Sequence, residues 1–495
     1  MQTLTYTVLE SYKLKKYKPL KMPPKPQHDV TGVDANNAIM IDYAKCIGCN
    51  MCIKACDVQG IGVYKQNEKP KYPPIVKLST LFNSDCIGCG QCATICPVDA
   101  IAPKNNLEVY KSESASKKIK VALIAPSTRV AFGDIFGLPI GTNTIYSLIR
   151  MLKQYLGFDY VFDVNFGADE TTVIDTQELL HFKHEGRGPV FTSCCPAWVN
   201  LCEMKYPELL PQVSTAKSCV AMVATLIKRR WAQEYLIPKG IVDSVDDVYV
   251  ADIMPCTAKK DESMRPQLNR DVDICLTVRE VAEHLYFLHG ARLTLEEVEA
   301  DASVLKPGRS TQKKWDFDAP FNTVSGGSHI FGKTGGVAET CLRFISYMKK
   351  SPIENVKEEL LKEFKTPGQL VQTVKLVSCE IAGETYRALI AHGGSAINAA
   401  ARMVLNKEVE CDVVEQMACP GGCQNGGGMP KIKGKKEAVL TRASTLDVLD
   451  GKERFASAGE NKTLWGFNGC LTEHEAHELL HTHYQHRPVE SLLPQ

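Results

Sequence analysis

The sequence has no long hydrophobic run. No stretch reaches the roughly 18 uninterrupted apolar residues that identify a transmembrane helix. The first residues, MQTLTYTVLESYKLKKYK, contain neither the apolar core of a signal peptide nor a twin arginine. We therefore expect no membrane partner and a cytoplasmic location.

The sequence also has no excess of one charge. Lys and Arg together number 58, Asp and Glu number 57, and the formal net charge is +1. This balance gives no electrostatic reason to expect a nucleic-acid partner. The 495 residues are too many for one hydrophobic core, so the length favours about two to four domains.

Cysteine, in contrast, is abundant, with 20 residues. In a reducing compartment these are not expected to form a disulfide framework, which leaves metal ligation, redox chemistry and plain buried thiols. Two runs, CIGCNMCIKAC and CIGCGQCATICP, share the spacing C-x2-C-x2-C-x3-C. Three cysteines of such a run bind one [4Fe-4S] cubane, and the fourth crosses to the other cluster.

This spacing predicts two [4Fe-4S] clusters and assigns their ligands. One cluster has Cys46, Cys49, Cys52 and Cys96, and the other has Cys86, Cys89, Cys92 and Cys56. A pair of zinc knuckles is the alternative, but zinc sites do not favour a doubled eight-cysteine arrangement. Residues 31–106 thus resemble a bacterial two-cluster ferredoxin domain, which would carry electrons.

The segments around this domain differ in composition. Residues 1–30 form a lysine- and proline-rich arm, which we expect to be extended, either as a solvated tail or as a docking segment for an acidic redox partner. Residues 107–118, which include KSESASKK, have the composition of a linker. From 119 to 495, apolar runs such as IKVALIAPS, YVFDVNF, DVYVADIM and YRALIAH alternate with helix-length segments. This alternation predicts a large α/β domain.

Three further cysteine motifs lie in this large domain: FTSCCPAW, IMPCTAKKDE and EQMACPGGCQNGGGMP. The first contains adjacent cysteines, Cys194 and Cys195, whose side chains leave the backbone in different directions, so the two can seldom bind one metal centre in the same way. One thiolate from the first motif, Cys256 from the second, and Cys419 and Cys423 from the third would complete the ligands of another cubane.

These three motifs, in this order behind a ferredoxin-like domain, closely resemble the signature motifs of iron-only (diiron) hydrogenases. The resemblance implies a two-lobed α/β catalytic domain over 119–495, with a C-terminal segment, about 436–495, wrapped around it. It implies reversible conversion of 2H+ and 2e- to H2 at an H-cluster. This cofactor is a [4Fe-4S] cubane joined by a cysteine sulfur to a diiron unit with CO, cyanide and a bridging dithiolate amine.

The resemblance also implies roles for the cysteines of the three motifs. Cys195, Cys256, Cys419 and Cys423 would hold the cubane, and Cys423 would bridge to the diiron unit. Cys194 would donate and accept protons, a role that suits a thiol because its pKa is tunable. A buried inert thiol is the alternative for Cys194.

Other pocket residues follow from the same resemblance. Lys259 would hydrogen-bond a cyanide ligand and Glu262 would orient its loop. The remaining matches to pocket positions, for which ordinary packing is the alternative, are Ser127, Met254, Phe331 and Met417. A proton route would use Asp175 and Glu178, one turn apart on a predicted helix, and the hydroxyl of Ser214.

The chain departs from the family pattern at several positions. Asp175 stands where the family usually has the longer glutamate, so the route would need an extra water or a shifted helix. Ala197 replaces a common glycine, and Val220 and Cys219 stand where many relatives carry glutamine and proline. These departures affect the expected rate, direction and oxygen sensitivity.

Partners and rival functions follow from this interpretation. Besides H2 and protons, we expect ferredoxin or a similar small redox carrier, and hydrogenase maturation proteins. The rivals are a non-enzymatic hydrogenase-like iron-sulfur assembly protein and an H2 sensor. Cys194 and Lys259 favour the enzyme, because a protein without a diiron unit needs neither, and no signalling domain is apparent for a sensor.

Two other motifs match known binding patterns but give weaker evidence of function. Residues 327–334, GSHIFGKT, fit the phosphate-binding pattern G-x4-G-K-[ST], but FNTVSG is a poor preceding strand. Residues 477–481, HELLH, fit the zinc-protease pattern, but little chain follows to supply a third ligand. A loosely bound adventitious metal is favoured there over a protease.

Overall fold

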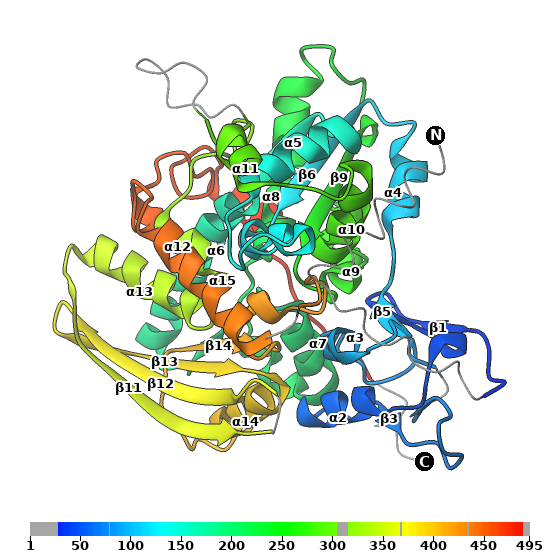
Figure 1. Ribbon diagram of the computed structural model, residues 1–495. Helices are drawn as coiled ribbons and strands as arrows, with labels where there is room; N and C mark the ends of the chain where they lie inside the picture. The colour runs from blue at the N-terminus through cyan, green and yellow to red at the C-terminus, as the bar shows by residue number, and fades with distance from the viewer. Residues whose placement is uncertain (1–27, 79, 304–314, 367–368, 433–434, 489–495) are drawn as a thin grey trace.

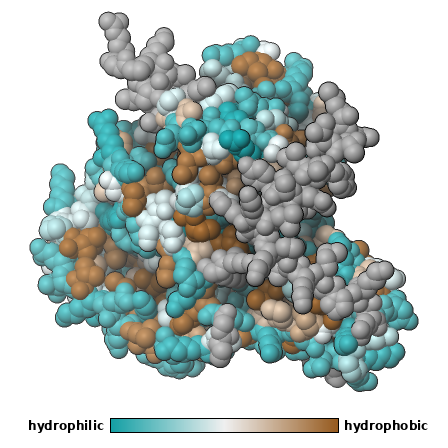
Figure 2. Space-filling view, viewed as in Figure 1, coloured by the Kyte–Doolittle hydropathy of each residue, from teal (hydrophilic) through white to brown (hydrophobic). Residues whose placement is uncertain are grey.

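The computed structural model describes residues 28–78, 80–303, 315–366, 369–432 and 435–488 (Figure 1). Most of the predicted N-terminal arm, residues 1–27, lies outside these ranges. Figure 1 shows a small N-terminal unit, in blue, beside two larger lobes. No helix within the described ranges is long and apolar enough to cross a membrane. On the face drawn in Figure 2, hydrophilic residues are interspersed with separate hydrophobic patches.

The N-terminal unit is built around the two cysteine runs. A three-stranded antiparallel sheet has the order β1-β2-β5, and β3 pairs with β4. Each run leads into a short helix, α2 or α3, through a residue with positive φ, Asn50 (59°) or Gly90 (67°). The bounds are β1 Val33–Ala35, β2 Ile39–Asp42, α2 Met51–Val58, β3 Tyr64–Lys65, β4 Ile75–Val76, α3 Gln91–Ile95 and β5 Ile101–Pro103.

The segment predicted as a linker, 107–118, is largely a packed helix, α4 (Leu107–Ser114). Leu107, Tyr110 and Ser114 are buried, and their spacing places them on one helical face. The ring of Tyr110 stacks on Phe158, 5.0 Å between centroids. Lys111 and Ser112, which contribute to the linker composition, are exposed, so composition alone concealed the apolar stripe.

The first lobe is a doubly wound α/β layer. Its parallel sheet has the order β10-β9-β6-β7. Helices α5 and α10 pack on one face, and α6 and α8 pack on the other. The bounds are β6 Ile119–Ile124, α5 Ile145–Tyr155, β7 Tyr160–Asp163, α6 Val164–Glu185, α8 Cys219–Leu226, β9 Val248–Met254, α9 Lys259–Glu262, β10 Ile274–Thr277, α10 Val278–Leu288 and α11 Leu295–Asp301.

The second lobe has a mixed five-stranded sheet of order β11-β12-β13-β14-β8. Strands β13, β14 and β8 are parallel, and β11, β12 and β13 are antiparallel. Helices α7 and α14 share one core cluster with this sheet, and α13 belongs to another. The bounds are β8 Val190–Phe191, α7 Pro196–Lys205, α13 Gly336–Lys349, β11 Ile353–Phe364, β12 Gln372–Ile381, β13 Glu384–His392, α14 Gly394–Leu405 and β14 Val413–Met417. The predicted two-lobed α/β fold is confirmed.

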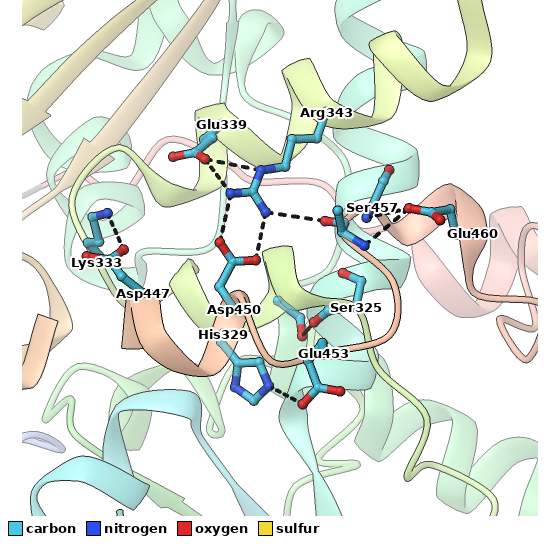
Figure 3. Close-up of polar contacts among 12 residues, drawn as sticks. Ser325, His329, Lys333, Glu339, Arg343, Asp447, Asp450, Glu453, Ser457 and Glu460 are labelled. Carbon is cyan, nitrogen blue, oxygen red and sulfur yellow. Dashed lines mark hydrogen bonds and ion pairs between the residues drawn. The ribbon is translucent and has the colours of Figure 1, made fainter. Parts of the chain in front are cut away.

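The C-terminal part contains α15 (Lys435–Asp450) and α16 (Glu473–Leu480). Ion pairs fix α15 and the following loop to α12 (Gly326–Ile330) and α13 (Figure 3). Arg343 bonds both Glu339 and Asp450, with its Nη1 atom 2.8 Å from Asp450 Oδ1. His329 Nε2 lies 2.9 Å from Glu453 Oε1. These contacts close one side of the space between the lobes.

Candidate functional site

The three large-domain cysteine motifs each follow a parallel strand. FTSCCPAW overlaps the end of β8, the Cys256 loop follows β9, and the Cys419–Cys423 loop follows β14. The carboxyl ends of parallel strands are where α/β folds present their binding loops. The two sheets therefore present these loops to one another between the lobes.

Four thiols meet in this space. Burial, and then the neighbouring thiols of Cys256, Cys419 and Cys195, raise the pKa of Cys423 well above its usual range. Burial and the thiols of Cys419 and Cys195 likewise raise the pKa of Cys256. Four partly buried thiols that repel one another as anions suit a positively charged cluster core, because metal binding favours the thiolate form. The donor set thus fits a cubane.

Glycines let the loops that carry these thiols approach each other. Gly421 and Gly422 have φ of +81° and +83°, which favour glycine. A Cβ on Gly422 would meet the carbonyl oxygen of Gly332 at 2.8 Å, and one on Gly426 would meet that of Pro255 at 2.1 Å. The glycine run after Cys423 therefore lets its loop pack against the loop that precedes Cys256.

Lys259 places a buried cation at this pocket. Its Nζ donates to Glu262 Oε2 at 2.6 Å, and the same oxygen accepts from Ser218 Oγ at 2.9 Å. Burial opposes the charge, but Glu262 first, and the thiols of Cys219 and Cys256 next, raise the pKa of Lys259. The ammonium stays charged, and Glu262 fixes its position rather than only orienting the loop.

The other predicted pocket residues separate into two groups. Phe331 and Met417 form a small apolar cluster with Ala168 and Val337, against which Cys194 and Cys219 pack. Ser127 Oγ accepts from Gln424 Nε2 at 3.1 Å, next to Cys423. Met254, in contrast, belongs to the hydrophobic core of the first lobe. The structure therefore gathers Phe331, Met417 and Ser127 near the thiols and gives Met254 a packing contact.

Cys194 and Cys195 diverge as their adjacency predicts. Cys195 faces the other thiols of the four-thiol set. Cys194 Sγ instead lies 3.9 Å from Cys219 Sγ, and this hydrogen bond, followed by burial, raises the pKa of Cys194 well above its usual range. The two neighbours thus line different sides of the pocket.

A chain of polar groups leads from Cys194 toward the surface along α6. Asp175 is fully buried, its Oδ1 accepts from Ser214 Oγ at 2.5 Å, and burial raises its pKa to about 7. Glu178 accepts from the backbone N–H of Thr215 at 3.2 Å and from the Thr215 hydroxyl. Asp175 Oδ2 is buried and makes no hydrogen bond to any described residue, consistent with the shorter side chain at this position.

Two further residues, Thr215 and His481, extend this series of polar groups. The sequence analysis did not place either of them in the site. Thr215 Oγ1 lies 2.6 Å from Nδ1 of His481, which follows α16. The Ser-Thr pair at 214–215 and the HELLH histidines were both visible in the sequence. Only the fold shows that residues 215 and 481 are neighbours.

The two ferredoxin-like cysteine runs form two further sets. Cys46, Cys49, Cys52 and Cys96 line a single pocket. In the other set, the pKa of Cys92 is well above its usual range. Burial raises it most, the thiols of Cys86 and Cys56 raise it further, and a hydrogen bond from Tyr64 opposes them. The fourth cysteine of each run thus lies with the first three of the other run, as predicted. Cys49 is exposed, so the first set reaches the surface.

The second set adjoins the four-thiol pocket. Burial and then the thiol of Cys419 raise the pKa of Cys89 well above its usual range. Gln91 Nε2 donates to the carbonyl of Asn425 at 2.8 Å, and Thr257 Oγ1 donates to that of Gly88 at 2.6 Å. Three thiol sets therefore run in order from the surface at Cys49 into the space between the lobes.

The phosphate-loop match at 327–334 has carboxylates where phosphate would need positive charge. Lys333 pairs with Asp447 (Figure 3). Just beyond the match, the N–H of Gly335 donates to Glu415 Oε1 at 2.6 Å. The preceding residues form no strand, as expected from FNTVSG. This geometry disfavours nucleotide binding.

The HELLH match lies on α16 and directly after it. The rings of His477 and His481 stack, with centroids 5.1 Å apart. Among the described residues, no three His, Cys, Asp or Glu side chains are arranged to hold a single metal ion. His481 instead contacts Thr215, and this contact does not depend on a metal.

Fold and thiol sets together define a multidomain iron-sulfur protein with a ferredoxin-like unit docked on a two-lobed α/β domain. Residues 118–427 match the family described as iron only hydrogenase large subunit, C-terminal domain, and residues 45–100 match the 4Fe-4S dicluster domain. The chain belongs to the iron-only hydrogenase family and has an N-terminal 4Fe-4S ferredoxin-like domain.

Individual relatives agree with this assignment. Iron hydrogenase 1 of Clostridium pasteurianum is 32% identical over 91% of this chain and 76% of the relative. The periplasmic [Fe] hydrogenase large subunit of Nitratidesulfovibrio vulgaris is 34% identical over 89% of this chain and 96% of the relative. The structure of apo [FeFe]-hydrogenase HydA1 from Chlamydomonas reinhardtii superposes with a TM-score of 0.61 and 29% identity, covering 77% of this chain and 99% of that one.

A second kind of relative is more distant. The cytosolic Fe-S cluster assembly factor NAR1 of Scheffersomyces stipitis is 26% identical over 69% of this chain and 71% of the relative. The family therefore includes proteins named for cluster assembly as well as hydrogenases.

Proposed function

We propose that this protein is a hydrogenase that catalyses the reversible conversion of 2H+ and 2e- to H2. The observation that carries the proposal is the joint presence, in one pocket, of the four-thiol set, the buried cation of Lys259 and a further thiol, Cys194. A simple electron-transfer cubane needs only the first of these. The other two groups suit a site where protons and an anionic cofactor meet.

The pocket residues would hold an H-cluster as the resemblance implies. Cys195, Cys256, Cys419 and Cys423 would bind its cubane, with Cys423 as the bridge to the diiron unit. When bound, the H-cluster supplies the site at which two protons and two electrons combine. Lys259, held by Glu262, would bind its cyanide side, while Phe331, Met417 and the backbone around Gly332 would restrict access of water.

Electrons would pass through the ferredoxin-like unit, which we assign to residues 31–106, ahead of a catalytic domain at 119–495. The order of the thiol sets supports two [4Fe-4S] clusters in series between the exposed Cys49 and the Cys419 pocket. Ferredoxin or a similar small carrier would dock near Cys49. Maturation proteins would supply the diiron unit, and we place the reaction in the cytoplasm.

Protons would leave the pocket through Cys194 and then along α6. Asp175 faces Cys194 closely enough for its charge to raise the pKa of that thiol further, after the Cys219 hydrogen bond and burial. Asp175 bonds Ser214, and Glu178 bonds the adjacent Thr215. Waters would bridge two steps of this route, one between Cys194 and Asp175 and one between the Asp175–Ser214 pair and the Glu178–Thr215 pair.

The rival function is non-enzymatic iron-sulfur assembly, and the NAR1 relative is named as a cytosolic Fe-S cluster assembly factor. Hydrogenase relatives have higher identity over more of the chain, at 32% over 91% against 26% over 69%. Cys194 and Lys259 also favour the enzyme, since an assembly protein has no diiron unit for them to serve. An H2 sensor is the third alternative.

Infrared spectroscopy of protein matured with its accessory proteins tests the proposal. Bands from CO and cyanide ligands, which protein groups do not produce, are expected together with dye-driven H2 evolution. Three cubanes and a diiron unit would give about 14 irons per chain. Full cubane loading without CO and cyanide bands would favour the assembly protein and reject the hydrogenase.

A further inference from the structure

The segment after α16 is fixed against the extended segment that carries Ser214 and Thr215. Residues Ala216 and His481 form an antiparallel bridge. The N–H of Lys217 donates to the carbonyl of Leu480 at 2.9 Å, and that of Thr482 donates to the carbonyl of Thr215 at 2.7 Å. Backbone bonds on both sides thus hold the imidazole of His481 at Thr215.

The hydrogen bonds assign a direction to this contact. The Thr215 hydroxyl donates its proton to Glu178 Oε1. Its oxygen therefore accepts from Nδ1 of His481, 2.6 Å away, which makes His481 the Nδ1–H tautomer. Nε2 is then the acceptor nitrogen of the ring. The polar chain consequently does not end at Glu178 but continues into an imidazole.

His481 lies where the buried chain reaches solvent. Its own side chain is half-buried, whereas His477, stacked on it at 5.1 Å, and His483 are exposed. Burial, then His477, His483 and Lys217, lower the pKa of His481 to about 4. Glu178, the carboxylate on its inner side, reaches it through Thr215. A neutral imidazole between a carboxylate and exposed histidines suits proton transfer better than proton storage.

We infer that His481 is the outermost relay of the proton route and that Thr215 connects it to Glu178. For inward transfer, Nε2 takes a proton from solvent or His477, Nδ1 gives its proton to Thr215 Oγ, and the Thr215 hydroxyl proton passes to Glu178. One proton enters, one leaves, and no electron moves. The starting tautomer is restored when the ring rotates to expose Nδ1 to solvent, Nδ1 gains a proton there, Nε2 loses its proton to solvent, and the ring rotates back. Outward transfer uses the same bonds in reverse.

This inference rests on the proposed function, since it extends the proton route from Glu178 to the surface. It also gives the HELLH histidines a role without a metal. The alternative is that His481 only fastens the C-terminal segment onto the segment that carries Thr215. The two roles differ in whether a small base can replace the side chain.

The closing experiment compares His481→Ala and His481→Gln with His474→Ala, a change at an exposed histidine on α16. H2 evolution with a dye that bypasses the ferredoxin-like unit is measured at equal infrared-determined cofactor loading. Both His481 variants should lose about tenfold or more of turnover, with an increased solvent isotope effect, and added imidazole should restore His481→Ala. His474→Ala should match the unchanged protein.

An activity-independent measurement accompanies this comparison. Nitrogen NMR of histidine-labelled protein should show His481 as the Nδ1–H tautomer, and Thr215→Val should shift its signal. Normal turnover of His481→Ala, a loss that imidazole does not restore, or the opposite tautomer in the unchanged protein would overturn the relay. If the unchanged protein had no H2 activity at full cofactor loading, the proposed function would be wrong instead. The NMR measurement would then still test the hydrogen bond between His481 and Thr215.

Discussion

The Sγ atoms of Cys194 and Cys219 lie 3.9 Å apart, on the wall of the pocket formed with Phe331 and Met417. Cys195, one residue away, turns toward Cys256, Cys419 and Cys423. Cys194 therefore lines the pocket wall and has no predicted metal bond, whereas Cys195 is a predicted cubane ligand. Their replacement should have different consequences.

Cys194→Ala should keep the cofactor and lose turnover. It removes a proton carrier but no metal ligand, so the infrared bands should survive while H2 evolution falls by about two orders of magnitude or more. Cys195→Ala should instead lower cofactor occupancy, because a cubane iron loses its thiolate. Iron content and infrared intensity per chain, measured beside turnover, separate the two effects.

Cys202→Ala is the matched control for both, since Cys202 is a buried thiol on α7 that donates to the carbonyl of Tyr206 at 3.4 Å and lies outside the three thiol sets. It should retain both cofactor and turnover. Asp is expected to replace Cys194 in part, because a carboxyl can also relay a proton, and to replace Cys195 poorly. Near-normal turnover of fully loaded Cys194→Ala would show that protons leave by another way.

Asp175→Asn should change the pH dependence of stability. Burial raises the pKa of Asp175 to about 7, well above the value of 3.8 from which it starts, so the folded chain holds a proton that the unfolded chain loses. The contribution of Asp175 to stability is therefore full at low pH, falls as the pH rises from about 4 to about 7, and stays low above that. Each pKa unit corresponds to about 1.4 kcal/mol.

Asparagine does not titrate and has no such loss. The midpoint temperature of thermal unfolding of Asp175→Asn, relative to that of the unchanged protein, should therefore increase as the pH is raised from 5.5 to 8. The other buried carboxylates are common to both proteins and cancel in the difference. Turnover should fall in the variant because asparagine cannot relay the proton. A stability difference that does not vary with pH would show that Asp175 is ionised throughout this range.

The sequence predicts much of the fold because its periodic signals are local. IKVALI, YVFD and VYVADIM become β6, β7 and β9, and the helix expected to carry Asp175 is α6. The linker composition of 107–118 conceals a packed helix, because charged and small residues cover one face of α4 while Leu107 and Tyr110 are buried on the other. The composition of a segment does not distinguish the two faces of a helix, whereas the spacing of its apolar residues does.

The site shows the same division between local and long-range information. Cysteine spacing was enough to predict which cysteines of 46–96 lie together, since that spacing is a property of the cluster. The contact of Thr215 with His481 joins residues far apart in the chain and depends on how the C-terminal segment returns to the lobe. The docking of Cys89 beside Cys419 likewise depends on tertiary packing, which no local pattern records.

Cys49→Ala should disconnect the protein from its electron carrier. Cys49 is the exposed thiol of the outer set, so its loss should remove one cluster, about four irons per chain. Ferredoxin-driven H2 evolution should fall sharply, whereas evolution driven by a small dye should be largely retained. Cys470→Ala, at an exposed cysteine outside the three sets, is the control. Equal ferredoxin-driven rates in both variants would reject the outer cluster as the entry point.

Gly427→Ala should disturb the junction between the ferredoxin-like unit and the pocket. A Cβ at Gly427 would lie 2.6 Å from Gly90 Cα and 2.7 Å from the carbonyl oxygen of Cys89, and backbone atoms in a packed junction cannot move aside easily. The expected cost is about 1–3 kcal/mol of stability, as for other overpacked sites. Because the Cys89 and Cys419 sets meet here, ferredoxin-driven turnover should fall more than dye-driven turnover.

Gly451→Ala provides the matched comparison for this last prediction. The nearest atoms to a Cβ at Gly451, the carbonyl oxygens of Asp447 and Val448, lie at 3.7 and 4.0 Å, which is ordinary contact. Thermal unfolding and the ratio of ferredoxin-driven to dye-driven rates should therefore remain close to those of the unchanged protein in Gly451→Ala and decrease in Gly427→Ala. If both variants kept the same ratio, transfer between the two thiol sets would tolerate a displaced junction, and the close backbone approach at Gly90 would serve stability alone.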